Sequence, residues 1–133
     1  MSKRINFKKK IIFLAYRKWA KSIIINLKKK IIFRNAHHFE YQNEFDKFIK
    51  NKKNYLIILI GWSNILKKKI VNDNTCIGVH PSDLPDYKGG SPIQNQILNN
   101  IIKTKASLFK LNTRIDDGDI YGKINLNLEG DNF

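Results

Sequence analysis

Apolar runs of strand length alternate along the chain with segments whose apolar residues recur every three or four positions. Residues 11–15 and 55–60 are unbroken apolar runs, whereas residues 19–27 and 39–49 carry apolar side chains at the spacing of one helical face. Strands that are apolar on both sides are typical of parallel sheets covered by helices on both faces. The pattern therefore predicts an α/β fold with an open, mostly parallel twisted sheet and helices on both faces.

Shorter signals predict the remaining elements. Residues 75–79 indicate a strand that ends in His80, and in open α/β sheets the carboxyl ends of strands carry the functional sites. A loop rich in Pro and Gly follows at residues 81–92, and three aspartates form an acidic turn at residues 116–119. Further strands are expected at residues 31–33, 106–111 and 120–128, further helices at residues 63–70 and 93–102, and further loops or turns at residues 35–38 and 72–74.

The length and composition of the chain fit one folded domain. Its 133 residues are 42% hydrophobic and 27% charged, which argues against wholesale disorder and allows a buried core. We therefore expect residues 1–133 to form a single domain.

Charge divides the chain into two unlike halves. Residues 1–70 contain 19 Lys and Arg against 3 Asp and Glu, whereas residues 71–133 contain 6 against 8. A Lys-rich half attracts anionic partners such as nucleic acid, a nucleotide-linked sugar or an anionic membrane face. Ile, Asn and Lys are abundant throughout, so compositional drift with weak anion attraction is the alternative. We favour it over a dedicated nucleic-acid site, because arginine, which suits bidentate phosphate contacts, is scarce.

The cysteine count and the start of the chain bear on its compartment. Cys76 is the single cysteine, so no internal disulfide forms, which suits a reducing cytoplasm. A basic start at residues 1–10 precedes an apolar run, as in a signal peptide, but that run ends at Arg17 and Lys18 without a small-residue cleavage pattern. Every apolar run is shorter than the roughly 20 residues of a membrane span. We expect a cytoplasmic protein without a membrane span.

Three separated motifs carry the candidate chemistry. They are Gly-Trp-Ser-Asn-Ile-Leu at residues 61–66, His-Pro-Ser-Asp-Leu-Pro-Asp-Tyr-Lys-Gly-Gly-Ser-Pro-Ile-Gln at residues 80–94, and Ile-Asp-Asp-Gly-Asp-Ile at residues 115–120. In this order and spacing they resemble the catalytic domain of the formyltransferases that act on methionyl-tRNA, amino sugars or glycinamide ribonucleotide. The resemblance covers about residues 55–130. It implies the Rossmann-like fold of that family and an enzyme that moves a formyl group from 10-formyltetrahydrofolate to an amine.

The resemblance gives the catalytic roles to His80 and Asp116. Attack by an amine on the formyl carbon makes the formyl oxygen negative, so a hydrogen-bond donor or a cation must face that oxygen, and the family's histidine does so. A nearby carboxylate favours the charged imidazolium and helps to carry the proton that leaves the amine. The Asp-x-Gly step aligns this carboxylate with Asp116 and not with Asp117 or Asp119.

One position departs from the family's pattern. Two residues before the histidine, family members usually have an asparagine whose side-chain amide also holds the formyl oxygen, and this chain has Gly78 there. Losing one such donor can cost about 10²- to 10³-fold in rate. A backbone amide, a water or a side chain such as Ser82 would have to replace it, or the protein is slow or inactive.

The resemblance also implies binding residues. It puts the folate donor in a cleft between two segments, largely through backbone contacts, and the amine substrate against the Gly-rich loop, whose N–H groups can approach an anion. The expected donor-binding residues are Ser63, Asn64, Leu66, Leu111, Thr113 and Ile115, and the expected substrate-binding residues are Pro81, Ser82, Lys88, Gly89 and Gly90. Core, turn and plain loop positions are the alternative. His37 and His38 lack partners at metal-ligand spacing, so we predict loop residues there and no metal site.

Two further features bear on the acceptor amine and on the extent of the domain. Residues 15–20 differ from the phosphate loop of the glycinamide ribonucleotide enzyme, and the carboxyl-terminal nucleic-acid-binding domain of the methionyl-tRNA enzymes is missing. We therefore expect a small anionic amine such as an amino-sugar nucleotide, with methionyl-tRNA as the alternative.

Residues 128–131 resemble the approach to a last helix of the family, and its absence would expose apolar surface. This favours low stability, a homodimer or a truncated gene product. A remnant that binds folate or a partner without turnover, and a basic nucleic-acid-binding module, remain as alternatives.

Overall fold

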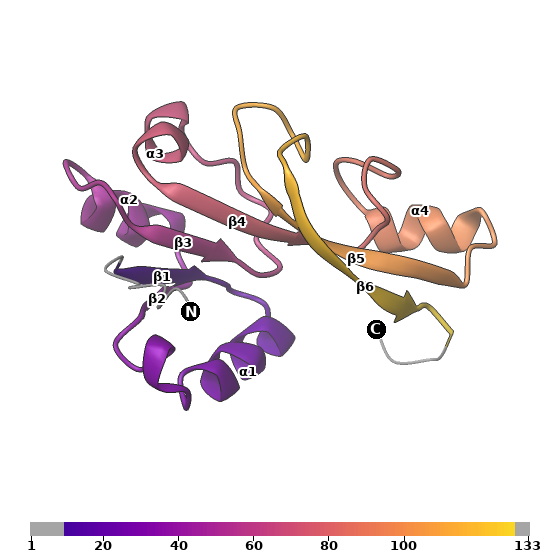
Figure 1. Ribbon diagram of the computed structural model, residues 1–133, viewed down its shortest axis with the longest axis horizontal. Helices are drawn as coiled ribbons and strands as arrows, with labels where there is room; N and C mark the ends of the chain where they lie inside the picture. The colour runs from indigo at the N-terminus through magenta and orange to yellow at the C-terminus, as the bar shows by residue number, and fades with distance from the viewer. Residues whose placement is uncertain (1–9, 130–133) are drawn as a thin grey trace, which may run out of the picture. The chain divides into compact units, whose positions relative to one another are not determined.

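The computed structural model describes residues 10–129, and its elements fall into two units, residues 1–75 and residues 76–133 (Figure 1). The basic start at residues 1–9 and the end at residues 130–133, which we compared with the approach to a last helix, lie outside the described residues.

Strand β1 (Ile11–Leu14) is the central strand of the first unit. It pairs in parallel with β2 (His37–Phe39) on one side and with β3 (Leu56–Leu59) on the other. Ile12 lies opposite His37 in one pair and opposite Ile57 in the other. Every residue of β1 is buried, as its unbroken apolar run predicts, and the expected parallel α/β arrangement is confirmed for this unit.

Helices connect these parallel strands. Helix α1 (Lys18–Leu27) takes the chain from β1 outward to β2, and α2 (Gln42–Ile49) takes it back past β1 to β3. Because such crossovers are right-handed and these two run in opposite directions, they lie on opposite faces of the three strands, as Figure 1 shows. A shorter helix, α3 (Lys68–Asp73), ends the unit.

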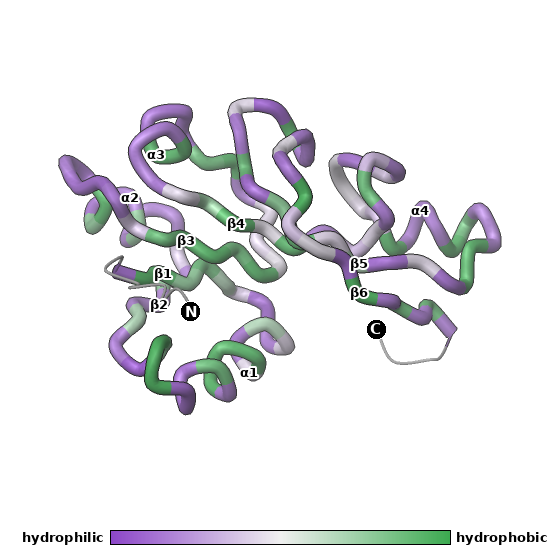
Figure 2. The backbone as a smooth tube through the Cα atoms, in the orientation of Figure 1, coloured by the Kyte–Doolittle hydropathy of each residue, from purple (hydrophilic) through white to green (hydrophobic). Residues whose placement is uncertain are grey.

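Large apolar side chains fill the space between these strands and helices. Phe13 and Ile12 of β1, Ile57 of β3 and Phe45 of α2 are all fully buried. Figure 2 shows the same distribution, with hydrophobic segments at β1 and β3 and hydrophilic connections around them. The first unit is therefore held mainly by apolar burial.

The predictions for residues 31–33 and 35–39 were wrong. Ile31–Phe33, expected to be a strand, forms a single 3-10 turn, η1, in which Ile31 and Ile32 are exposed. His37–Phe39, expected to be a loop and the start of a helix, forms β2. This strand needs only the hydrogen-bonding edge of β1, and the His38 ring nitrogen Nε2 lies 2.9 Å from the Ala15 carbonyl oxygen. It therefore forms without the apolar run that marks a buried strand.

The second unit contains antiparallel strands. Strand β4 (Thr75–His80), whose first residue still belongs to the first unit, pairs with β5 (Lys103–Lys110), and β5 pairs with β6 (Ile120–Asn127). Between β4 and β5 the chain forms the loop at residues 81–91 and helix α4 (Pro92–Leu98). Among the pairings described here, those of β1 are parallel and those of β5 are antiparallel, so the sheet is mixed.

Two predicted helices differ from the structure in their ends. Helix α3 begins at Lys68 instead of residue 63 and continues to Asp73, into the predicted turn at residues 72–74. Helix α4 ends at Leu98, four residues before the predicted end. Ser91 precedes α4 in the left-handed region, and Pro92 occupies its first turn, which a fixed φ and a missing N–H suit.

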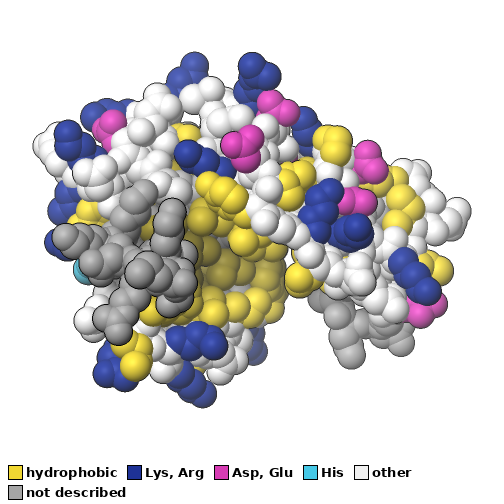
Figure 3. Space-filling model, viewed as in Figure 1, with side chains coloured by type: hydrophobic (Ala, Val, Ile, Leu, Met, Phe, Trp, Pro, Cys, Tyr) yellow, Lys and Arg dark blue, Asp and Glu magenta, His cyan; other side chains and the backbone are white. Residues whose placement is uncertain are grey.

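Charged side chains follow the division seen in the sequence. Figure 3 shows Lys and Arg side chains, in dark blue, over the helices of the first unit and a smaller number on the second. Residues 1–75 contain 19 Lys and Arg against 4 Asp and Glu, whereas residues 76–133 contain 6 against 7. Within residues 10–129, no helix has both the length and the apolar character needed to cross a membrane.

Candidate active site

His80 ends strand β4 and is 7% exposed. Its ring nitrogen Nε2 lies 2.7 Å from the carbonyl oxygen of Tyr87, and its Nδ1 lies 3.5 Å from the carboxylate oxygen Oδ2 of Asp116. The Tyr87 carbonyl can only accept, so its hydrogen bond requires a proton on Nε2, and the contact with Asp116 is an ion pair only when the ring carries both protons. The structure thus brings together the two side chains, 36 positions apart, that the motifs single out.

Asp116 is held beside His80 by the loop on the other side. The backbone N–H of Gly89 donates to Asp116 Oδ2 over 2.7 Å, and Asp116 itself has φ 51°, in the left-handed region that aspartate tolerates. Its neighbour Asp117 instead pairs with Lys88 at 2.7 Å and with Arg114 at 3.3 Å. Of the adjacent aspartates in this turn, Asp116 is therefore the one that faces the imidazole.

The acidic turn needs a glycine at residue 118. A Cβ atom on Gly118 would lie 1.4 Å from the backbone oxygen of Lys110, the last residue of β5. The next residue confirms how closely the two segments approach, because the N–H of Lys110 donates to the carbonyl of Asp119 over 2.8 Å. The Asp-x-Gly motif at residues 116–118 thus holds the turn against β5, and this contact positions Asp116.

Buried hydroxyl groups hold the start of the loop at residues 81–91. Ser82 is fully buried, and its hydroxyl donates to the Asp86 carbonyl over 2.6 Å. Ser107 of β5 donates to the Ser82 carbonyl over 2.7 Å and accepts from the Leu84 N–H over 3.2 Å. The Ser82 hydroxyl is therefore committed within the loop and is not free to replace the amide that Gly78 lacks.

Three residues of the same loop have positive φ, a backbone conformation that residues other than glycine rarely adopt. Tyr87, whose carbonyl contacts His80, has φ 56°, Gly89 has φ 86°, and Ser91 has φ 53°. Left-handed conformations of ordinary residues cost about 1–3 kcal/mol each and concentrate at functional sites. Here Tyr87 itself contacts His80, and Ser91 lies two residues after Gly89, which contacts Asp116.

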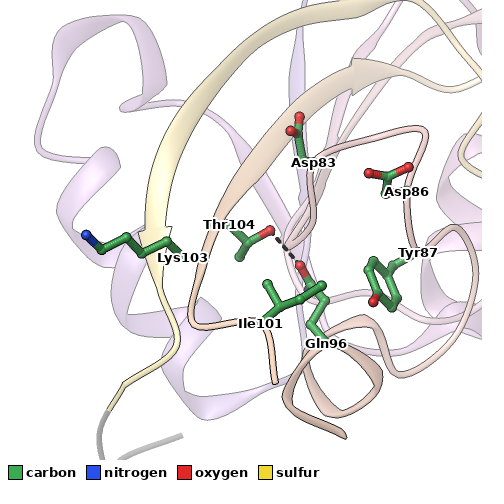
Figure 4. Close-up of a pocket in the computed structure, with 7 residues that line it drawn as sticks. All are labelled: Asp83, Asp86, Tyr87, Gln96, Ile101, Lys103 and Thr104. Atoms are coloured by element: carbon green, nitrogen blue, oxygen red, sulfur yellow. Dashed lines mark hydrogen bonds between the residues drawn. The ribbon is translucent and has the colours of Figure 1, made fainter. Parts of the chain in front are cut away.

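Gln96 of α4 is a further residue of this arrangement that the sequence analysis missed. It is 1% exposed, and its Nε2 donates to the carbonyls of Pro81 and Pro92 over 2.8 and 2.9 Å, while its Oε1 accepts from the Thr104 hydroxyl over 2.5 Å (Figure 4). It also lines a cavity of about 150 Å³ together with Tyr87. Gln96 thus ties the residue after His80 to α4 and β5. A glutamine one turn into a short helix gives little signal of such a role.

Two carboxylates at the site have lowered pKa values. A hydrogen bond from Lys88, and then the charge of Lys88, lowers the pKa of Asp117. A hydrogen bond from Lys123 likewise lowers the pKa of Asp83, and Lys123 also donates to the Leu84 carbonyl over 2.7 Å. Lys88, expected to contact the substrate, is thus engaged with Asp117 in this conformation.

Gly78 lies on β4 opposite Phe109 of β5. A Cβ atom there would lie 3.0 Å from a methyl carbon of Leu111 and 3.1 Å from the Phe109 ring. The two apolar side chains therefore occupy the space that an asparagine side chain would need. Restoring the family's asparagine requires both side chains to shift by a few tenths of an ångström.

The residues expected to bind folate lie in both units. In the first unit, Ser63 hydrogen-bonds the Tyr16 hydroxyl and Leu66 is buried, whereas Asn64 is exposed. In the second, the Leu111 N–H donates to the Cys76 carbonyl over 2.8 Å, and Thr113 and Ile115 are exposed. Their binding role stays a prediction, as does the substrate role of Pro81, Ser82, Lys88, Gly89 and Gly90. Within residues 10–129, no three His, Cys, Asp or Glu side chains form a group that could hold a metal ion.

Comparison with known proteins identifies the family of this chain. The sequence profile of the formyl transferase family matches residues 8–129. The methionyl-tRNA formyltransferase of Rickettsia rickettsii is 30% identical over 123 residues, which cover 83% of this chain and 40% of that protein. The chain spans 25% to 40% of the length of the curated relatives it matches.

Solved structures give the same result. Methionyl-tRNA formyltransferase from Clostridium thermocellum matches 92% of this chain and 55% of its own with a TM-score of 0.80 and 33% identity. A sugar N-formyltransferase from Shewanella matches 89% of this chain and 57% of its own with a TM-score of 0.67 but 21% identity, and so it shows only that the fold is shared. The expected open α/β fold of the formyltransferases is thereby confirmed.

Proposed function

Because this chain belongs to the formyl transferase family, we propose that it transfers a formyl group from 10-formyltetrahydrofolate to a primary amine, the α-amino group of methionyl-tRNA. The contact between His80 and Asp116 carries this proposal. These are a proton donor and a proton acceptor 3.5 Å apart at the end of a strand, held by Tyr87 on one side and Gly89 on the other.

The transfer requires one bond to form and one to break. The amine nitrogen bonds to the formyl carbon, the bond from that carbon to the folate nitrogen breaks, the amine loses a proton and the folate nitrogen gains one. Nothing is oxidised or reduced. His80 donates an N–H to the formyl oxygen as that oxygen becomes negative, and Asp116 receives the proton of the amine.

The residues of the second unit fit this chemistry in part. When bound, 10-formyltetrahydrofolate supplies the formyl group. His80 supplies one N–H donor toward the formyl oxygen, but it must give up its contact with Tyr87 or with Asp116 to do so. Gly78 supplies no side-chain donor. We therefore expect a turnover rate about 10²- to 10³-fold below that of an enzyme with both donors.

The preference for methionyl-tRNA replaces our initial preference for an amino-sugar nucleotide. Relatives at 30% to 34% identity are methionyl-tRNA formyltransferases, whereas the similarity to sugar N-formyltransferases extends to the fold alone. The absent carboxyl-terminal domain, on which the sugar preference rested, is no argument, because the chain spans only part of its relatives.

The test is formyl transfer by the full chain from 10-formyltetrahydrofolate, with methionyl-tRNA and an amino-sugar nucleotide as alternative acceptors. We expect formyl-methionyl-tRNA to form, and His80→Ala and Asp116→Asn each to lower kcat/KM by about 10²- to 10⁴-fold. Asp119→Asn is the matched control, because this exposed aspartate lies in the same turn. Equal losses in all three variants would contradict the assigned roles.

A remnant that binds without turnover is the second candidate, and the observation that favours it is Gly78. The discriminating variant is Gly78→Asn combined with Leu111→Ala, since Leu111 occupies the space next to residue 78. Activity that is absent from the parent and appears only in this double variant would support the remnant. Activity in the parent that His80→Ala abolishes would exclude it.

A further inference from the structure

A groove in the first unit, formed by α2, the turn after it and α3, has no part in the proposed reaction. Its volume is about 470 Å³, and it is lined by residues 46, 47, 49–52, 67, 69, 70, 73 and 74. Ile49 and Ile70, both nearly buried, give it an apolar part, and lysines surround them. Binding pockets for small ligands range from about 300 to 1,000 Å³, so one nucleotide fits in this groove.

The charge of the groove is strongly positive. Five lysines line it (Lys47, Lys50, Lys52, Lys67 and Lys69), against two carboxylates, Asp46 and Asp73. Lys69 pairs with Asp73 at 2.6 Å and Lys67 lies 3.8 Å from Asp46.

Two of these lysines remain free to bind an anion. Lys52 is engaged with the end of α2, since it donates to the Phe48 carbonyl and lies over the Phe48 ring. Among residues 10–129, Lys47 and Lys50 have no carboxylate within ion-pair distance. Lys53 and Lys68 adjoin the groove in sequence, add two more exposed ammonium groups and extend the positive charge along the chain.

We propose that this groove, which we call the α2–α3 groove, binds the phosphate backbone of RNA. The gathering of five lysines around one groove replaces the preference for compositional drift that the scarcity of arginine suggested. Lysine ammonium groups contact phosphates as point charges and carry no base-reading geometry, so the contact is independent of sequence and depends on salt. Several ammonium groups around one nucleotide-sized groove suit a chain of phosphates. The proposal rests on the proposed function only in naming tRNA as the RNA.

The test compares two triple variants of the full chain that lose the same charge. Lys47→Gln, Lys50→Gln and Lys67→Gln change the groove. Lys18→Gln, Lys29→Gln and Lys30→Gln change three exposed lysines of α1 and the residues after it, in the same unit. Binding of tRNA without an attached amino acid is measured at several salt concentrations. Vesicles of phosphatidylserine and phosphatidylcholine are a second probe, and thermal melting confirms that each variant is folded.

We expect the groove variant to lose tRNA affinity by about 10-fold or more at low salt, and its slope of log K against log salt to become shallower by about 2. The control variant should lose less than about 3-fold. Binding that survives His80→Ala but fails in the groove variant supports the groove whether or not formyl transfer occurs. Equal losses in both triple variants, or a loss of vesicle binding with tRNA binding unchanged, would overturn the proposal.

Discussion

The described part of the first unit has a core of the buried apolar side chains Ile12, Phe13 and Phe45. The described part of the second unit is instead held at its candidate site by hydrogen bonds of Ser107, Gln96 and Asp116. In the first unit the buried side chains are mainly apolar, with Asn74 as a buried polar residue, and lysines far exceed carboxylates. In the second, buried polar groups fix a loop whose backbone is partly left-handed. Apolar burial tolerates a wide range of surface residues, but a polar network requires a particular partner at each position.

The largest effect on stability should come from the apolar core. Phe45→Ala removes a fully buried ring from between α2 and the strands, and such a cavity costs about 3–5 kcal/mol in the free energy of unfolding. Urea unfolding measures this loss. Tyr41→Ala, at an exposed position just before α2, is the control and should change stability by less than about 0.5 kcal/mol. A similar loss in both variants would show that Phe45 is not a core residue.

The second unit should instead lose stability when the hydrogen bonds of Gln96 are removed. Gln96→Leu keeps the volume but leaves the Pro81 and Pro92 carbonyls and the Thr104 hydroxyl without their partner, at a cost of about 1–3 kcal/mol. We also expect formyl transfer to fall, because the residue after His80 loses its anchor. Thr104→Val breaks only one of these contacts and should cost less in both assays. If Gln96→Leu lowers stability but leaves kcat and its pH profile unchanged, Gln96 is structural and does not position His80.

Alkaline pH should weaken the second unit through Cys76. Burial raises the pKa of this thiol from 9.0 to about 12, against a smaller opposing effect of Lys110. The folded state keeps the thiol proton that the unfolded state loses above pH 9. The contribution of this thiol to the free energy of unfolding is therefore complete below pH 9 and is lost by pH 12. The expected loss is about 1.4 kcal/mol per pH unit in that range. Cys76→Ala should flatten the dependence of unfolding on pH, and an unchanged dependence would contradict the assignment.

The smallest effect should come from the exposed ion pairs beside the site. Lys88→Met removes the main cause of the low pKa of Asp117, so the pKa of that carboxyl should rise toward 3.8, measured by NMR titration. Arg114→Met, which removes a weaker cause, should raise it less. A lowered carboxyl pKa stabilises the folded state above about pH 4 and ceases to do so at lower pH. At pH 7 we expect the free energy of unfolding to change little in either variant. A larger rise of the Asp117 pKa in Arg114→Met than in Lys88→Met would show that Arg114, not Lys88, is the main cause of the low pKa.

Elements whose own residues decide their conformation could be predicted. The apolar runs predicted β1 and β3, a shorter signal predicted β4, and the helical spacing of residues 19–27 predicted α1. Strand β2 was missed because an edge strand depends on a partner far along the chain, and the apolar residues Ile31 and Ile32 misled because they are exposed in the fold. The spacing of the motifs likewise singled out His80 and Asp116, but nothing local marked Gln96.

The sequence by itself determined the buried strands β1 and β3, the family, and the pair of residues that face each other at the candidate site. Only the tertiary structure decided that Asp117 turns away to Lys88, that Leu111 and Phe109 fill the space beside Gly78, and that lysines from two helices line one groove. Each of these depends on atoms brought together from distant positions in the chain. Residue order fixes composition and periodicity, but it does not fix which distant groups meet.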